Sequence, residues 1–129
     1  MIHLLIVDDD DINIFLIKHL LKKCSHEIQA VTFTDPVEAL SYIKKSIIEG
    51  ESIDLLLLDI NMPILKGWDL LKELRIDGKS ILKRTKVYML SSSLHKADHE
   101  LANKYDEVSG FISKPLSHEH LTKMFREIK

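Results

Sequence analysis

Short runs of apolar residues, each bounded by polar residues, constrain the fold of this chain more than any other feature. Three of them are Leu4–Val7, Leu55–Leu58 and Val87–Leu90. Apolar runs of about four to eight residues are typical of strands that are covered on both faces, as in parallel sheets. Weaker stretches at Ile28–Thr32 and Phe111–Ile112 predict an edge strand and a further strand. The chain is therefore expected to form a sheet of five short strands.

Helical patterns alternate with these strands. The apolar residues at helical spacing are Ile12, Phe15, Leu16 and Leu20 within about 11–24, then Leu40, Ile43 and Ile47, then Trp68, Leu71 and Leu74, and finally Leu121, Met124, Phe125 and Ile128. A more polar helix is expected at about 96–105. Such spacing gives a helix one apolar stripe that faces the core. Asp35 as N-cap, with Pro36 and Glu38 at the first and third positions, marks the start of the second helix.

The alternation of strand and helix, repeated five times, implies an α/β fold with a parallel sheet and helices on both faces. With right-handed crossovers, the expected topology is a doubly wound, five-stranded sheet in the order 2-1-3-4-5. The chain has 129 residues, of which 45% are hydrophobic and 29% are charged, which is the balance of a globular protein with a core. We therefore expect a single domain that spans residues 1–129.

Composition argues against several classes of protein. The net charge is −2 and no basic block is present, so direct contact with nucleic acid is not expected. No apolar run approaches the ~20 residues of a membrane helix, and the start "MIHLLIVDDD" has too short an apolar part for a signal peptide. The single Cys24 forms no internal disulfide, which fits a reducing compartment. We therefore expect a cytoplasmic protein.

Polar residues converge where the predicted strands end. The first strand runs into Asp8, Asp9 and Asp10, the third into Asp59, the fourth into Ser91, Ser92 and Ser93, and the fifth into Lys114 and Pro115. In a doubly wound sheet the functional crevice lies at these carboxyl ends, where the winding direction reverses. Carboxylates gathered there raise one another's pKa, and Mg²⁺ relieves their repulsion by binding carboxylate, carbonyl and water oxygens. With an ammonium and a hydroxyl group added, the set provides what phosphoryl transfer requires.

Each of these features alone has a simpler structural interpretation. Acidic residues after a strand often cap the next helix, which is how we interpret Asp10, and Asp59 alone fits a turn cap. A run of serines and a lysine–proline pair are ordinary loop composition. Their joint occurrence at four successive strand ends favours a functional site.

The segments "LLIVDDD", "LLLLDINMP" followed by "KGW", "VYMLSS" and "GFISKP" resemble, in order and spacing, the receiver domain of bacterial response regulators. The resemblance covers essentially the whole chain. It implies a flavodoxin-like fold, similar to the chemotaxis regulators, and a phosphorylation-controlled switch of a two-component or phosphorelay system. Such a domain is not an enzyme in the usual sense, because it catalyses only its own phosphorylation and slow dephosphorylation. The implied partners are a sensor histidine kinase or a histidine phosphotransfer protein, and an unknown downstream protein.

The resemblance also implies the roles of the acidic residues. Asp59 matches the aspartate that accepts the phosphoryl group. Asp8 and Asp9 match the acidic pair that holds Mg²⁺ together with Asp59 and the main-chain oxygen of Asn61, and Mn²⁺ can substitute for Mg²⁺.

Other matches concern the conformational switch. Ser91 matches the hydroxyl residue that moves toward the phosphoryl group, with Ser92 as the second candidate, and Lys114 matches the lysine that contacts it. Phe111 stands at the aromatic switch position, where many members have tyrosine, so no phenol hydroxyl is available there. Pro115 is expected to follow a cis peptide bond. The face formed by the fourth helix, fifth strand and fifth helix is then expected to change for partner binding.

Two other functions fit parts of this pattern. A haloacid-dehalogenase-like phosphatase also places a nucleophilic aspartate after an apolar strand, but it needs a second acid two residues later, where this chain has Asn61. A degenerate scaffold would lack site residues, all of which are present here. The chain fits a regulator that acts on a separate protein, one domain of a longer chain, or a phosphate sink or relay intermediate. A dimer that forms on phosphorylation fits as well.

Overall fold

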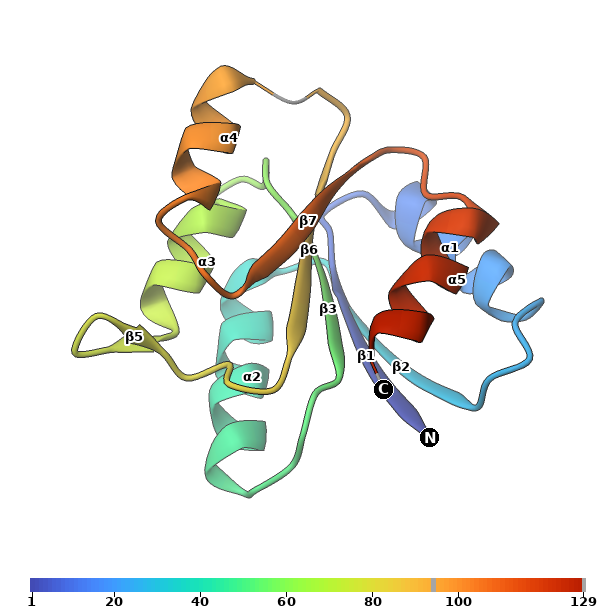
Figure 1. Cartoon of the computed structure of the whole chain (residues 1–129), viewed down its shortest axis with the longest axis horizontal. Helices are drawn as coiled ribbons and strands as arrows, with labels where there is room; N and C mark the ends of the chain where they lie inside the picture. The colour runs from blue at the N-terminus through green and yellow to red at the C-terminus, as the bar shows by residue number, and fades with distance from the viewer. Residues whose placement is uncertain (94, 129) are drawn as a thin grey trace.

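A computed structural model describes residues 1–93 and 95–128, and its strands and helices alternate along most of the chain (Figure 1). The elements are β1 (Ile2–Val7), α1 (Asp11–Leu21), β2 (Ile28–Phe33), α2 (Pro36–Ile48), β3 (Leu55–Asp59), α3 (Gly67–Glu73), β4 (Arg75–Ile76), β5 (Lys79–Ser80), β6 (Lys86–Ser91), α4 (Lys96–Ala102), β7 (Val108–Ser113) and α5 (His118–Glu127). Among the described residues, no helix is both long and apolar enough to cross a lipid bilayer.

Five of the strands form one parallel sheet in the order β2-β1-β3-β6-β7. Counted along the sheet strands alone, this is the predicted order 2-1-3-4-5, with β2 at an edge as expected. The two central strands β1 and β3 pair in register, Leu4 opposite Leu55 and Val7 opposite Leu58. The predicted doubly wound α/β fold is therefore confirmed.

Both faces of the sheet are covered by helices. α1 and α5 lie on one face, and α2, α3 and α4 lie on the other (Figure 1). Successive side chains of a strand point to opposite faces. Leu55 and Leu57 therefore pack with α1 and α5, while Leu56 and Leu58 pack with α2 and α3. The run of four leucines is buried along its whole length because each face of the sheet has its own core.

The helix starts follow the expected capping chemistry. The Asp10 carboxylate accepts a hydrogen bond from the N–H of Ile12 at 2.9 Å, and Asp35 caps α2 in the same way, with Pro36 in its first turn. The predictions of Asp10 and Asp35 as helix caps are confirmed. α1 and α4 end a few residues earlier than predicted, at Leu21 and Ala102.

The predicted core-facing stripe of α1 is wrong at three of its four positions, and only Leu20 is partly buried and packs against the core. Ile12 and Phe15 are 71% and 68% exposed, and Leu16 is also exposed, while Ile14 and Ile17 are buried against the sheet. Apolar residues occur on every side of this helix, so their spacing alone does not select one face. The exposed stripe leaves an apolar surface on the outer side of α1.

A short antiparallel hairpin, β4–β5, joins α3 to β6 and is not among the predicted elements. Asp77 and Gly78 form its turn, and both have a positive φ, 53° and 77°. An aspartate–glycine pair is a strong signal for a two-residue hairpin turn because these residues tolerate left-handed backbone. The sequence thus contained the signal for this element.

Candidate functional site

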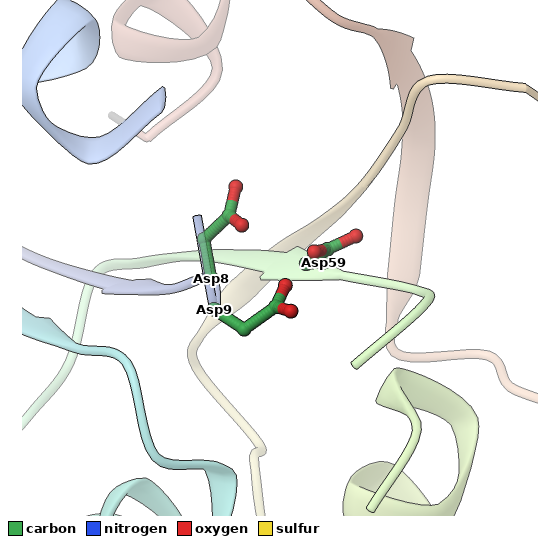
Figure 2. A group of neighbouring side chains, drawn as sticks. All are labelled: Asp8, Asp9 and Asp59. Atoms are coloured by element: carbon green, nitrogen blue, oxygen red, sulfur yellow. The ribbon is translucent and has the colours of Figure 1, made fainter. Parts of the chain in front are cut away.

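Three carboxylates gather at the carboxyl ends of the central strands. Val7 pairs with Leu58, so Asp8 and Asp59 come next on adjacent strands, and Asp9 follows. Figure 2 shows the group at the ends of β1 and β3, and one oxygen of each carboxylate lies within 4.8 Å of the others. Asp8 and Asp59 are buried, whereas Asp9 is exposed. Within the described residues, this is the one group of three or more such side chains close enough to hold a metal ion.

The environment of Asp59 disfavours its ionised form. Burial, followed by the negative charge and a hydrogen bond of Asp8, raises the pKa of Asp59 to about 7, although Lys114 opposes the shift. Clustered carboxylates with this kind of repulsion are stabilised by a hard divalent cation. The oxygen donors of Asp8, Asp9 and Asp59 therefore fit Mg²⁺ or Mn²⁺.

Lys114 supplies the positive charge of the site. Its Nζ lies 2.9 Å from Oδ2 of Asp8 and 3.3 Å from Oδ2 of Asp59. Burial alone lowers the pKa of Lys114, but its contacts with the two carboxylates outweigh this effect, so the pKa is raised. The N–H of Lys114 donates to the carbonyl of Ser91 at 2.9 Å, and its peptide bond to Pro115 is cis. The lysine thus lies directly after the end of β7, in contact with both carboxylates, and is charged at neutral pH.

Asn13 belongs to the site although no motif in the sequence indicates it. It is buried on the sheet-facing side of α1, and its Nδ2 donates to Oδ2 of Asp8 at 2.6 Å. The other oxygen of Asp8 accepts the N–H of Asp10 at 2.9 Å. With Lys114, three donors fix the orientation of the Asp8 carboxylate. The sequence signal was a polar residue between apolar neighbours, which is hard to separate from an exposed position.

Ser91 ends β6 with its side chain buried. Its hydroxyl donates to the carbonyl of Ser93 at 2.6 Å and accepts the N–H of the same residue, so it faces its own loop. Ser92 is exposed and lies beyond the end of the strand. On the neighbouring strand β7, Phe111 is half-buried, and its ring centroid lies 6.0 Å from that of Trp68 and 5.1 Å from that of His99. The hydroxyl and the aromatic ring thus lie on adjacent strands, each with a local partner.

The loop from Asp59 to α3 is tightly built. The N–H of Asn61 donates to Oδ1 of Asp59 at 3.2 Å, and Gly67 donates to the carbonyl of Ile60 at 2.9 Å. A Cβ at Gly67 would lie 2.5 Å from the carbonyl oxygen of Asp59, so only glycine fits. Ile64 has a φ of 73° and is bridged by a hydrogen bond from Leu65 to Pro63. This is a strained γ-turn for a β-branched residue.

Comparison with known proteins identifies the family of this chain. The family model described as "Response regulator receiver domain" matches residues 4–126. The chain is 31% identical over 124 residues to the 3',5'-cyclic-nucleotide phosphodiesterase regA of Dictyostelium discoideum, covering 95% of this chain and 14% of that protein. It is 30% identical over 125 residues to the putative two-component response regulator ARR21 of Arabidopsis thaliana, covering 97% of this chain and 18% of that protein. The chain spans less than a fifth of these relatives.

Solved structures give the same result. A two-component response regulator from Cytophaga hutchinsonii superposes with a TM-score of 0.83 at 30% identity, covering 98% of this chain and 95% of that one. The chemotaxis protein CheY4 of Vibrio cholerae superposes with a TM-score of 0.77 at 25% identity, covering 100% and 99%. The strand order and the position of the acidic group are those expected of this fold. The chain belongs to the response regulator receiver domains of two-component signalling.

Proposed function

We propose that this receiver domain accepts a phosphoryl group on Asp59 and works as a phosphorylation-controlled switch. The observation that supports this most directly is the position of Asp59, which is buried at the end of β3 next to Asp8 and 3.3 Å from the ammonium of Lys114. A carboxylate with a nearby ammonium and a set of metal-binding oxygens is arranged for attack on phosphorus.

The chemistry follows from the residues at the rim. An oxygen of Asp59 forms a bond to phosphorus while the P–N bond of a donor phosphohistidine breaks, and the donor imidazole leaves with the bonding electrons. Asp8, Asp9, Asp59 and the main-chain oxygen of Asn61 would hold Mg²⁺ or Mn²⁺, which would neutralise charge on the phosphoryl oxygens. Lys114 already contacts Asp59 and exchanges that contact for a phosphoryl oxygen.

The product is an acyl phosphate that carries about two negative charges and three acceptor oxygens. These oxygens attract the hydroxyl of Ser91, which gives up its contact with Ser93. Phe111 then moves relative to α4, and the face formed by α4, β7 and α5 changes shape. The output is a shift in population toward a second state of the domain, and this state binds a downstream protein or forms a dimer.

The proposed donor is a sensor histidine kinase or a histidine phosphotransfer protein. α1 begins two residues after Asp9 and exposes Ile12 and Phe15 on its outer side. An exposed apolar stripe beside the reacting carboxylate is suited to receive the donor protein. We also propose that residues 1–129 form one domain that works in the cytoplasm and whose only catalysis is its own phosphorylation and slow dephosphorylation.

A phosphatase that uses an aspartyl-phosphate intermediate is less well supported. Such an enzyme needs a proton-transferring group near the nucleophile, and the second residue after Asp59 is Asn61, whose amide does not transfer protons. Asn61 is also exposed.

Intact-protein mass after incubation with acetyl phosphate tests the proposal. Wild-type protein is expected to gain the mass of one phosphoryl group only when Mg²⁺ is present, and alkali should remove the added mass. Asp59→Asn should gain none, and Asp106→Asn, at an exposed carboxyl far along the chain, should behave like wild type. No gain in a folded wild-type protein that binds Mg²⁺ would contradict the proposed switch.

A further inference from the structure

Asn13 is a buried amide on a helix face that is otherwise apolar. Its side chain is 5% exposed, and it shares the buried side of α1 with Ile14 and Ile17. A buried amide lowers stability unless its polar atoms are hydrogen-bonded. Its Nδ2 donates to Asp8 at 2.6 Å, a short bond of the kind formed with a charged acceptor.

This bond bears on the orientation of a proposed metal ligand. Oδ2 of Asp8 accepts from Asn13 and from Lys114, and Oδ1 accepts from the N–H of Asp10. The proposed function requires Lys114 to turn to a phosphoryl oxygen. Of the two side chains that donate to Oδ2, only Asn13 then remains in place. We propose that Asn13 is a positioning residue that fixes Asp8 for Mg²⁺ binding, an inference that rests on the proposed function.

Mg²⁺ affinity of the unphosphorylated protein tests this role. Asn13→Leu keeps the number and branching of the side-chain heavy atoms and suits the apolar surroundings. We expect isothermal titration calorimetry to give about tenfold weaker Mg²⁺ binding, the usual effect of removing a partner that orients a ligand. Ser46→Ala is the matched control, because Ser46 is equally buried but lies on α2. The Mg²⁺ affinity of Ser46→Ala should equal that of the wild-type protein.

The outcomes separate the inference from the proposed function. Unchanged Mg²⁺ affinity in folded Asn13→Leu, or in Asn13→Ala if the first variant does not fold, would overturn the role of Asn13 alone. A folded wild-type protein that binds no Mg²⁺ would overturn the proposed function, and the role of Asn13 with it.

A second, independent observation concerns the attachment of α4. Of its seven residues, all of which the structure describes, Asp98 is the one that is buried. The indole N–H of Trp68 donates to Oδ1 of Asp98 at 3.1 Å, and Oδ2 accepts the N–H of His95 at 3.1 Å. Leu101 and Ala102 are only partly buried. The one buried residue of this short helix is a carboxylate. How firmly the helix is held therefore depends strongly on the group that donates a hydrogen bond to that carboxylate.

Trp68 connects this helix with the loop from Asp59 to α3, called the phosphorylation loop below. It follows Gly67, whose backbone touches that of Asp59, so its position is tied to the end of β3. Its ring lies 5.3 Å from that of Tyr105, which follows α4, and 6.0 Å from that of Phe111 on β7. One side chain therefore contacts α4, the turn that follows it, and β7.

The geometry points to the Trp68–Asp98 hydrogen bond as a tether that positions α4 against the phosphorylation loop. It forms a route from Asp59 to the α4 face through α3, separate from the route through Ser91. The tether itself is a property of the unphosphorylated protein, while its part in signalling rests on the proposed function.

Hydrogen exchange of the α4 amides tests the tether without any phosphorylation. Trp68→Phe removes the N–H but keeps an aromatic ring, and we expect exchange over Lys96–Ala102 to become about tenfold faster. Tyr105→Phe changes a neighbouring aromatic residue but keeps the tether, so α4 exchange should stay near the wild-type rate. Unchanged exchange in folded Trp68→Phe would overturn the tether.

Beryllofluoride with Mg²⁺ serves as the phosphoryl mimic in a second arm of the experiment. In wild type we expect it to change the exchange of both α4 and β7, and in Trp68→Phe to change β7 but leave α4 with less than half of its response. An equal α4 response in both proteins would overturn the part in signalling. No response in wild type would contradict the proposed function while leaving the first arm valid.

Discussion

Asp59 combines burial with negative neighbours, and this combination has a measurable cost in stability. Its pKa of about 7 in the folded protein lies above the ordinary value near 4 in an unfolded chain. The folded state therefore binds the proton more tightly, so the buried charge destabilises the protein fully above pH 7. The effect becomes smaller as the pH falls from about 7 toward 4.

Asp59→Asn removes this charge. Without Mg²⁺ at pH 8, we expect the free energy of unfolding to rise by about 1–3 kcal/mol. The gain is smaller than the full pKa shift would give, because solvent at the open side of the site screens the charge. Urea unfolding at pH 8 and at pH 5, in the presence of EDTA, measures the difference. The gain should be smaller at pH 5. A gain that is equal at both pH values would contradict the electrostatic explanation.

Gly67 is required by a close approach of two backbone segments. Gly67→Ala places a methyl group 2.5 Å from the carbonyl oxygen of Asp59, and we expect a loss of about 1–3 kcal/mol in the free energy of unfolding, together with weaker Mg²⁺ binding. Gly50→Ala is the control, because nothing lies within 4 Å and only its positive φ is strained. It should cost about 1 kcal/mol and leave Mg²⁺ binding unchanged.

Ile64 is a site where stability can be gained. Its φ of 73° is unfavourable for a β-branched residue, and its side chain is 90% exposed, so little packing offsets the strain. Ile64→Asn should raise the free energy of unfolding by about 1 kcal/mol, since asparagine tolerates left-handed backbone. Ile64→Val keeps the branched Cβ and should give no gain. Equal unfolding curves for the two variants would show that the turn is not strained.

At the scale of helices and strands, the sequence predicted what depends on pattern and missed what depends on packing. Leu55–Leu58 was predicted as a buried strand because a short unbroken apolar run is typical of a sheet covered on both faces. α1 was predicted as a helix. Its buried side was not predicted correctly, because the apolar residues of α1 itself are not confined to one side of the helix. The hairpin at Asp77 and Gly78 was overlooked, although its turn residues signal it.

The assignment of the buried side of α1 can be tested with two substitutions. Ile17→Ala removes a fully buried side chain and should lower the free energy of unfolding by about 2–5 kcal/mol. Phe15→Ser alters an exposed side chain and should change it by less than about 0.5 kcal/mol. Chemical denaturation of both variants measures the difference. A larger loss for Phe15→Ser than for Ile17→Ala would reverse the assignment.

At the scale of the whole molecule, the parallel topology explains why a site could be expected from sequence at all. Strand ends that are far apart in the chain meet at one edge of the sheet, so Asp8, Asp59 and Lys114 were expected to be neighbours before their distances were known. Asn13 could not be found in this way because it reaches the site from a helix face. The contact between Trp68 and Asp98 joins two helices, and strand topology does not specify it.

In the same arrangement, two short series of contacts connect the site with the proposed output face. β3 carries Asp59, α3 follows it through Gly67, and Trp68 reaches α4 and β7. On the other route, β6 ends in Ser91, whose carbonyl is bonded to the backbone of Lys114. A charge added at one rim therefore has two structural connections to the α4–β7–α5 face.

The proposed switch depends on Asp59 itself accepting the phosphoryl group, and chemical trapping identifies the residue that is modified. Wild-type protein is treated with acetyl phosphate and Mg²⁺, and borohydride then reduces the acyl phosphate of an aspartate to homoserine. Peptide sequencing by mass spectrometry should find homoserine at position 59 and unmodified aspartate at Asp8 and Asp9. Homoserine at Asp8 or Asp9, or at no position in a protein that has gained phosphoryl mass, would contradict the account.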